Sequence, residues 1–202
     1  MKKRYITAAI SVLAALTMCL CAVSQQRQQR LAEKLIRLHV VANSDTQEDQ
    51  RVKLLVRDAV LQAAVDALDG NNDPEAALQT QLPTIERAAN ETLAALGSGN
   101  TAKVSLKREL FPTREYETFR LPAGVYRSLR VTIGAGAGHN WWCVVFPVLC
   151  FPANAADFEA VCEAAGFTGE EISVLTEDSG EIEVEFKTLE LLGKLKKFFL
   201  DA

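Results

Sequence analysis

Cysteine and histidine are the residue types in this 202-residue chain that could carry nucleophilic chemistry. Cys143 and Cys150 bound the stretch CVVFPVLC, and His139 stands just before it. A thiol enzyme needs a histidine or a helix N-terminus beside the sulfur to activate it. Nothing in the pattern would orient His139, and His39 falls on the less apolar face of a predicted strand, where a structural histidine is the commoner outcome. We therefore predict no catalytic residues and no enzyme, with an exported thiol-dependent hydrolase as the alternative.

The same two cysteines could instead pair with each other in an oxidising compartment. A disulfide bond across so short a loop would stabilise the fold by roughly 2.5 kcal/mol in the chain-entropy model. Sequence spacing does not give Cβ geometry, so both states of Cys143 and Cys150 stay open. Cys162 lies in FEAVCEAA among apolar residues at helical spacing, and we predict it to be a buried small hydrophobe.

Three ligand classes find no matching pattern. The glycine-rich segment 134–138, GAGAG, precedes an apolar strand pattern, whereas a phosphate-binding loop needs a helix N-terminus after it. We expect this segment to be a hairpin turn. Two histidines in all, without paired CxxC or HxxxH spacing, predict no metal site, and we predict no cofactor. A formal net charge of −4 without a basic tract argues against nucleic acid as a partner.

A short polar segment, Asn43-Ser44-Asp45, separates an apolar strand pattern from a charged helical one. Asp45 or Thr46 can cap the following helix, because each has an acid three residues further on. The polar residues would then serve to end a strand and begin a helix. The alternative is that they form part of a surface that contacts a receptor.

The second unusual segment is HNWW, which holds His139, Asn140, Trp141 and Trp142. Adjacent tryptophans on a strand point to opposite faces of the sheet. One can enter the core, while the other, if no helix covers it, is a plausible hot spot for receptor contact. The alternative is that both rings are buried.

The order of hydrophobic periodicities predicts the fold class. An apolar run at 35–42 fits an interior strand, and a helical pattern with two apolar stripes follows at 47–68. Together with the later elements, this predicts an α+β fold with a mainly antiparallel sheet, the 35–42 strand near its centre and helices packed on one side. The later predicted elements are helices at 74–81 and 83–96 separated by Pro83, strands at 102–110, 113–122, 124–134 and 141–147, a helix at 155–165, a hairpin over 171–186 that turns at 178–180, and an amphipathic helix at 188–200.

The N-terminus has the pattern of an export signal. A basic start at 1–4 precedes an uncharged apolar run at 6–23, and small residues before Gln25 suit a cleavage site. The run is also long enough to remain as a membrane anchor. We predict a signal peptide or anchor helix at 1–24, a polar linker or the first turns of a helix at 25–34, and a single α+β signalling domain at 35–202. Without residues 1–24 the chain loses three of its 22 cations and no acid, so its net charge becomes −7 and only the N-terminal segment is expected to touch a membrane.

Two stretches, in this order, resemble one known family, stage II sporulation protein R. They are IRLHVVANSDTQEDQRVKLLVRDAV at 36–60 and AGVYRSLRVTIGAGAGHNWWCVVFPVLC at 123–150, and the resemblance covers about residues 35–165. FPVLC departs from the family pattern, in which a second proline is expected. The segment after residue 168 carries little of the family signature.

The resemblance implies an exported signalling protein of sporulation. Such proteins are made in the forespore and secreted into the space between the two membranes. The implied partner is a membrane-embedded aspartic protease of the mother cell, which processes pro-sigma-E. The family brings no catalytic residues, and a membrane-anchored envelope scaffold is a further alternative.

Overall fold

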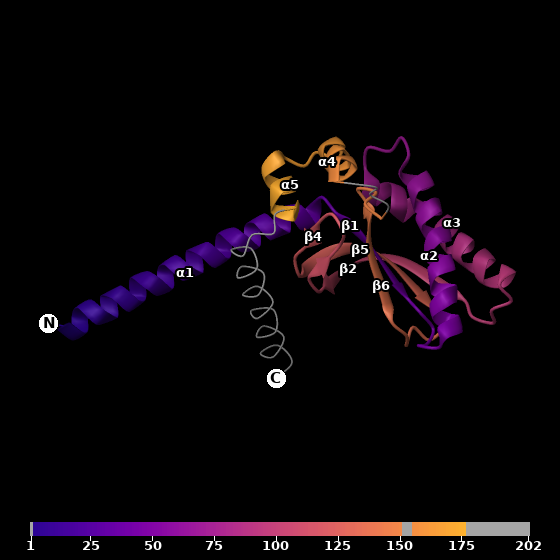
Figure 1. Ribbon diagram of the computed structural model, residues 1–202, viewed down its shortest axis with the longest axis horizontal. Coiled ribbons are helices and arrows are strands. Elements are labelled where there is room, and N and C mark those ends of the chain that lie inside the picture. Colours follow the sequence, from indigo (N-terminus) through magenta and orange to yellow (C-terminus); the bar gives the residue numbers. More distant parts are fainter. Residues whose placement is uncertain (1, 151–154, 177–202) are drawn as a thin grey trace.

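The structure is a computed structural model that describes residues 2–150 and 155–176 (Figure 1). Within these two ranges, runs of helices and runs of strands follow one another as an α+β fold. In chain order the elements are α1 Lys2–Glu33, β1 Ile36–Val41, α2 Gln47–Leu68, α3 Pro74–Ala95, β2 Ala102–Phe111, β3 Arg114–Glu115, β4 Arg120–Leu121, β5 Gly124–Ile133, β6 Asn140–Phe146, α4 Ala155–Ala164 and α5 Gly169–Thr176.

The main sheet is built around β1, which confirms the predicted interior strand. The strand order is β2-β5-β1-β6, and all six residues of β1 are buried. β1 pairs with β6 in the antiparallel direction, and so does β2 with β5, but β1 and β5 run parallel. The sheet is therefore mixed, because the chain passes through α2, α3 and β2 before it returns as β5.

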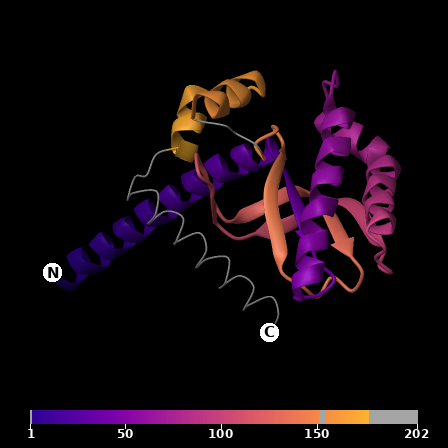
Figure 2. The same cartoon turned by 45° about the vertical axis from the view of Figure 1, so that its right-hand side comes forward.

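One face of the sheet packs against α2 and α3, which lie side by side in Figure 2. Leu38 and Val40 of β1 point to this face and meet α2 residues such as Val56 and Val60. The apolar positions of α2 recur at helical spacing and therefore form one apolar side, which covers the core. The first core forms between these helices and the sheet.

The expectation that helices pack on one side only is wrong, because the opposite face carries a second core. The last turn of α1 supplies Leu31, and α4 and α5 supply Phe158 and Leu175. Figure 2 shows these helices across the sheet from α2 and α3. A small hairpin, β3–β4, completes this cover: residues 113–122 fold back on themselves instead of forming the single predicted strand.

α3 is a single helix, although Pro83 was expected to divide it into two. Proline removes the N–H that would bond to the carbonyl of Gln79. Both residues are exposed, so water can satisfy that carbonyl. Leu78 and Ile85, on either side of the proline, are buried in the first core. Packing of the apolar stripe therefore outweighs the local cost of the proline.

α5 corrects the predicted hairpin at 171–186, because Glu171–Thr176 is helical. Thr168 Oγ1 accepts a hydrogen bond from the backbone N–H of Glu171 at 3.3 Å, and Glu171 Oε2 accepts one from the N–H of Thr168 at 2.8 Å. This reciprocal pair is a capping box, which starts a helix. The rest of the predicted hairpin and the helix at 188–200 lie outside the described residues.

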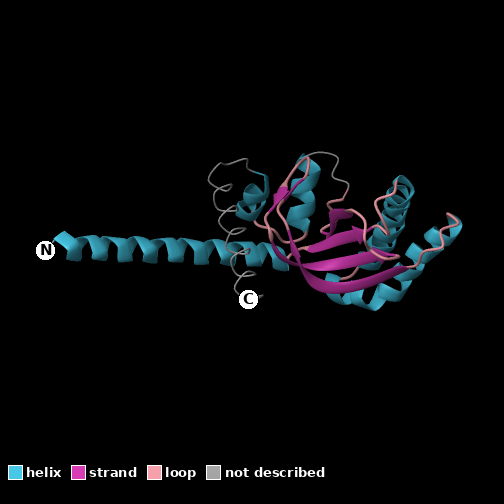
Figure 3. Ribbon diagram, turned by 90° about the horizontal axis from the view of Figure 1, so that it is seen from below, coloured by secondary structure: helices cyan, strands magenta, loops and turns pink. Residues whose placement is uncertain are grey.

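α1 extends away from the sheet and carries the N-terminus to the far end of the molecule (Figure 3). It continues as a helix through the expected linker as far as Glu33, and its C-terminal part is packed: Leu31 and Ala32 are buried, and the Gln28 side chain lies against Gly124. Among the helices that the structure describes, none combines the length and hydropathy needed to cross a bilayer.

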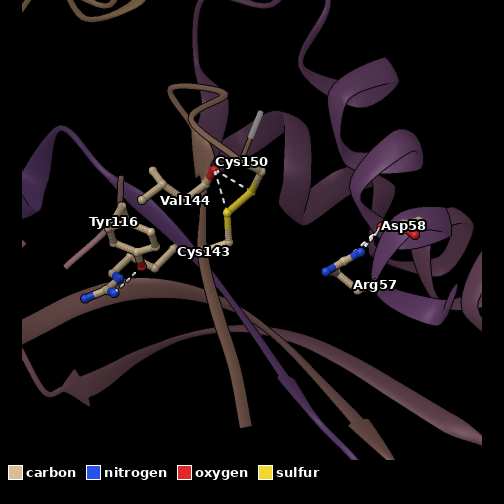
Figure 4. The surroundings of a disulfide bond; sticks show 7 residues. Arg57, Asp58, Tyr116, Cys143, Val144 and Cys150 are labelled. Atoms are coloured by element: carbon tan, nitrogen blue, oxygen red, sulfur yellow. Dashed lines mark hydrogen bonds and ion pairs between the residues drawn. A yellow bond between two sulfur atoms is a disulfide. The ribbon is translucent and has the colours of Figure 1, made fainter. Parts of the chain in front are cut away.

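Cys143 and Cys150 form a disulfide bond, with their Cα atoms 5.7 Å apart (Figure 4). Cys143 is buried in β6, and Cys150 follows the turn at the end of that strand. Leu149, inside the bridged loop, is buried in the second core. The bridge therefore holds the exit of β6 against the rest of the domain.

Removal of this bridge by the double change Cys143→Ala and Cys150→Ala should lower the free energy of unfolding by about 2.5 kcal/mol, because the unfolded chain regains the freedom of a short loop. Urea unfolding followed by tryptophan fluorescence measures this loss. A reductant should cause a similar loss in the wild-type chain and in the control Cys162→Ala, but none in the double variant. A wild-type midpoint that does not move on reduction would contradict a stabilising bridge.

Candidate functional site

Two segments that are far apart in the sequence meet at the C-terminal end of β1. The backbone carbonyls of Ala42 and Asn43 accept hydrogen bonds from the N–H groups of Gly138 and Ala137 at 3.0 and 3.1 Å. Asn43 Oδ1 accepts a further bond from the N–H of Ala135 at 2.9 Å. We call residues 43–45 and 135–141 together the polar seam. The glycine-rich segment is a turn between β5 and β6, but the expectation of a hairpin is wrong, because β1 lies between these two strands in the sheet.

Three glycines of this turn are required for two reasons, a left-handed backbone conformation and a close approach to the backbone of Ser44. Gly134 and Gly136 have φ angles of 53° and 61°, in the left-handed region that favours glycine. At Gly138 a Cβ atom would overlap the carbonyl of Ser44. The repeated glycines therefore allow the turn to bend and to lie against the segment that follows β1.

Asp45 and His139 join the two halves of the polar seam. Asp45 Oδ1 accepts a hydrogen bond from the backbone N–H of His139 at 2.6 Å and is also bonded to His139 Nδ1. These hydrogen bonds from His139 lower the pKa of Asp45. Beneath them the buried Lys53 Nζ donates to the carbonyl of His139 at 3.2 Å. Both Asp45 and His139 are exposed, so the joined pair is open to a partner.

Thr46, beside the polar seam, is the N-cap of α2. The sequence predicted that either Asp45 or Thr46 would take this role. Its Oγ1 accepts a hydrogen bond from the N–H of Asp49 at 3.2 Å. Ser44 Oγ and Asn43 Nδ2 both donate hydrogen bonds to Asp49 Oδ2. These two bonds lower the pKa of Asp49, and the bond from Ser44 has the larger effect. Strand-end and helix-cap chemistry thus explains this segment locally. Receptor contact by Asn43, Ser44 and Asp45 stays a prediction.

Trp141 and Trp142 point to opposite faces of the sheet, as predicted. Trp141 remains 37% exposed on the α2 side, where the Arg57 guanidinium lies 4.5 Å from its ring centroid. Arg57 is itself held by Asp58 (Figure 4). Trp142 packs on the second core and stacks on His39 with ring centroids 3.8 Å apart. Only the first of the two rings is therefore free to meet a partner.

His39 is the buried structural histidine that the sequence predicted. Its Nε2 lies 2.8 Å from Asn140 Oδ1, and its Nδ1 lies 3.1 Å from Glu109 Oε2. Glu109 also accepts a hydrogen bond from Arg130 at 2.7 Å. Burial alone would raise the pKa of Glu109, but the neighbouring side chains of Ser128, Arg130 and His39 lower it to about 2. Asn140 therefore links the polar seam to a charged network inside the domain.

Sequence reasoning missed Glu109 and Arg130, because both sit on the polar side of alternating strands and a solvated face was expected. The hairpin β3–β4 and the aromatic residues of the second core partly cover that face. A local signal was present: Lys107 and Glu109 alternate on β2, and Arg130 lies on its neighbour β5. The pairing of the two strands was needed to bring them together.

Arg37 is a second buried charge of β1 and was also missed. Its side chain is fully buried, and Nη2 donates to Tyr116 Oη at 2.8 Å. The guanidinium carbon lies 4.1 Å from the ring centroid of Phe111 and 5.0 Å from that of Tyr126. Burial lowers the pKa of Arg37. Desolvated cation–π contacts contribute about 2 kcal/mol, less than the cost of burying an ion, which is on the order of several kcal/mol.

The chemical options of the described residues are narrow. Bridged cysteines have no nucleophilic thiolate, and burial raises the pKa of Cys162 to about 11. No three metal-ligating side chains converge anywhere in residues 2–150 and 155–176. The polar seam offers hydrogen-bonding groups and one exposed aromatic ring, which suit recognition of a partner.

Comparison with known proteins identifies a family and a relative that this chain resembles. The model of the family described as "Stage II sporulation protein R (spore_II_R)" matches residues 32–156. Stage II sporulation protein R of Bacillus subtilis (strain 168) is 35% identical over 143 residues, which cover 69% of this chain and 63% of that protein. The match thus spans less than two thirds of the relative's length. No solved structure matches this chain.

The Glu109 network should make stability depend on pH in the acid range. A carboxylate whose folded pKa is depressed to about 2 stabilises the fold above its ordinary value of 4.5, and this contribution is lost as pH falls from about 4.5 towards 2. The loss should amount to about 3 kcal/mol. Urea unfolding at pH 6 and at pH 2.5 measures it.

The variant Glu109→Gln should lack most of this acid-dependent loss, while Glu91→Gln, an exposed residue of α3, should behave like the wild type. Equal acid sensitivity of Glu109→Gln and the wild type would show that Glu109 does not hold the network in its charged form.

Proposed function

This chain belongs to the stage II sporulation protein R family, and we propose that it acts in sporulation as an exported protein ligand that triggers a protease by binding it. The observation that carries this proposal is the polar seam. Hydrogen bonds join two distant segments there, and Asp45, His139 and Trp141 are exposed within the seam.

The ionisation of the site supports a ligand over an enzyme. A general acid or base works best with a pKa near the working pH. The pKa values of Asp45, Asp49 and Glu109 are all lowered, away from neutrality, by hydrogen bonds that hold the structure together. The disulfide bond removes the two cysteines on which the alternative, an exported thiol hydrolase, would depend.

The proposed receptor is the membrane-embedded aspartic protease that processes pro-sigma-E, as the family resemblance implies. A non-enzymatic ligand can activate a protease only by binding its active state better than its inactive one. The polar seam is suited to this, because its polar groups are already fixed by internal hydrogen bonds and little order would be lost on binding.

The proposed route is export from the forespore into the space between the two membranes. The basic start and apolar run of residues 1–24 support export. N-terminal sequencing of the exported protein distinguishes a cleaved ligand, which begins near Gln25, from the alternative of an anchored envelope scaffold.

The variant Trp141→Ala should weaken binding of the mature chain to the external region of the protease by about 30-fold or more, the effect of a hot-spot residue. Its melting temperature should stay close to that of the wild type, because the ring is partly exposed. Isothermal titration calorimetry measures the affinity. Leu110→Ala, which also removes an exposed apolar side chain, is the control and should bind normally. Undiminished binding by Trp141→Ala would rule out this ring as a contact.

Variants of the neighbouring residues Asp45 and Thr46 should distinguish a role in receptor binding from a role in helix capping. Thr46→Ala should cost about 1 kcal/mol of stability through loss of the cap and should leave binding intact. Asp45→Ala should reduce binding with a smaller effect on stability, because its partner His139 lies at the surface. The same calorimetry, with urea unfolding, tests both. The opposite outcome, lost binding in Thr46→Ala alone, would exclude Asp45 as a contact.

A further inference from the structure

The first half of the outer edge of β2 is covered by side chains of α3. β2 lies at one end of the main sheet and pairs with β5, so its other edge has no neighbouring strand among the described residues. Asn90 bonds to the N–H and the carbonyl of Ala102, at 2.9 and 3.0 Å. Glu86 accepts a hydrogen bond from the N–H of Val104 at 2.8 Å. These backbone groups of Ala102 and Val104 therefore face outward and are satisfied by the helix.

The second half of this edge is open. Outward-facing backbone groups recur at every second residue of an edge strand, so those of Leu106, Arg108 and Leu110 follow. In the part of the chain that the structure describes, no group bonds to them. The apolar surface beside them is also uncovered: Leu110 is 66% exposed, and its partner across the ladder, Val125, is 48% exposed. Open edges of this kind are templates for another strand.

The chain itself contains a strand pattern that lacks a partner. Residues 181–186, EIEVEF, alternate strictly between glutamate and an apolar side chain. Such alternation is typical of a strand with one buried face. The sequence predicted that this strand pairs with residues 171–176 in a hairpin, but those residues belong to α5. An isolated strand is not stable in water, so residues 181–186 need another edge.

The end of α5 lies close to the end of β2. α5 contacts β4 (Figure 1), and its last residue, Thr176, lines a surface hollow together with Tyr116. Tyr116 in turn bonds to Arg37 at 2.8 Å. The guanidinium carbon of Arg37 lies 4.1 Å from the ring centroid of Phe111, the last residue of β2. This series of direct contacts places Thr176 near the end of the open edge.

The segment after Thr176 is long enough to reach this edge. Residues 177–180 lie between Thr176 and Glu181, and five steps along an extended chain span up to about 18 Å. A strand that starts at the end of β2 and runs back along it is antiparallel to β2. Its apolar side chains then extend the uncovered surface of Leu110, and its glutamates lie on the opposite face of the sheet.

The charges of β2 favour an acidic strand at this edge. Lys103 and Arg108 are exposed, and neither forms an ion pair with another residue that the structure describes. Lys107 pairs with Glu109, which leaves β2 with more cations than acids. Opposite charges on facing strands are stabilising, whereas like charges are not. The three glutamates of residues 181–186 therefore suit this edge better than a second copy of β2 would.

We propose that the open edge of β2 is a docking site for residues 181–186 of this chain, which add to the main sheet as a fifth strand, antiparallel to β2. The strand bonds to the outward backbone groups of Leu106, Arg108 and Leu110 and covers the apolar surface of Leu110 and Val125. It also closes an edge to which other chains could add. β6, which carries part of the polar seam, lies at the opposite end of the sheet, so the inference does not depend on the proposed function.

Hydrogen exchange of single amides, measured by NMR on the isotope-labelled full chain, tests the docking. The amides of Leu106, Arg108 and Leu110 should exchange slowly in the wild type, because each donates to the docked strand. The double change Val184→Pro and Glu185→Pro removes two neighbouring N–H groups, one of which must face β2. It should raise the exchange rates of the three amides at least tenfold.

Two controls show where this effect comes from. The matched double change Leu195→Pro and Lys196→Pro, in the predicted helix at 188–200, should leave the three exchange rates as in the wild type. The amide of Val104, which is bonded to Glu86, should keep its wild-type rate in every variant and so report that the domain remains folded. Loss of protection in the second double variant alone would overturn the proposal, because another part of the C-terminal segment would then cover the edge.

Two further outcomes contradict the docking. Fast exchange of the three amides in the wild type, or slow exchange that survives the double change Val184→Pro and Glu185→Pro, overturns the proposal. Protection that rises with protein concentration identifies a second copy of the chain as the occupant and overturns it as well.

Discussion

The fold depends on β1, because the side chains of this strand must fill two cores at once. The strand is paired on both edges and buried along its whole length, so alternate side chains enter two separate interiors. Leu38 and Val40 meet α2 on one side, and Arg37 and His39 enter the other. Apolar residues satisfy the first interior simply by packing. Arg37 and His39 are polar and need hydrogen-bond partners inside the second core. Tyr116 bonds to Arg37, and Glu109 bonds to His39.

Local signals in the sequence were enough to predict what depends on neighbouring residues. Thr46 caps α2 because an acid follows at the right spacing, and the tryptophans separate because a strand alternates. Two errors came from local signals weighed wrongly. Pro83 was given more weight than the apolar stripe around it, and the capping box from Thr168 to Glu171 was overlooked in favour of a strand pattern.

Other features could not follow from one segment at a time. Glu109 and His39 are 70 positions apart, and only the strand order β2-β5-β1 brings them to one face. The second core needs α1, α4 and α5 to converge, and their individual patterns do not say which face of the sheet they cover. The same limit applies to the polar seam: its two halves were both singled out as unusual, but their union through Asp45 and His139 is a tertiary contact.

The polar seam and Arg37 differ in how their polar groups are satisfied, and this difference bears on function. In the seam, Asp45 and Asn43 already have hydrogen-bond partners, so a protein that binds there meets a fixed shape and gains mainly by complementarity. Arg37 has two nitrogens, Nε and Nη1, without a hydrogen-bond partner among the described residues, so its burial carries a desolvation cost. The satisfied groups of the polar seam therefore give it a fixed shape, whereas the buried cation of Arg37 is a cost that the packing of the second core has to outweigh.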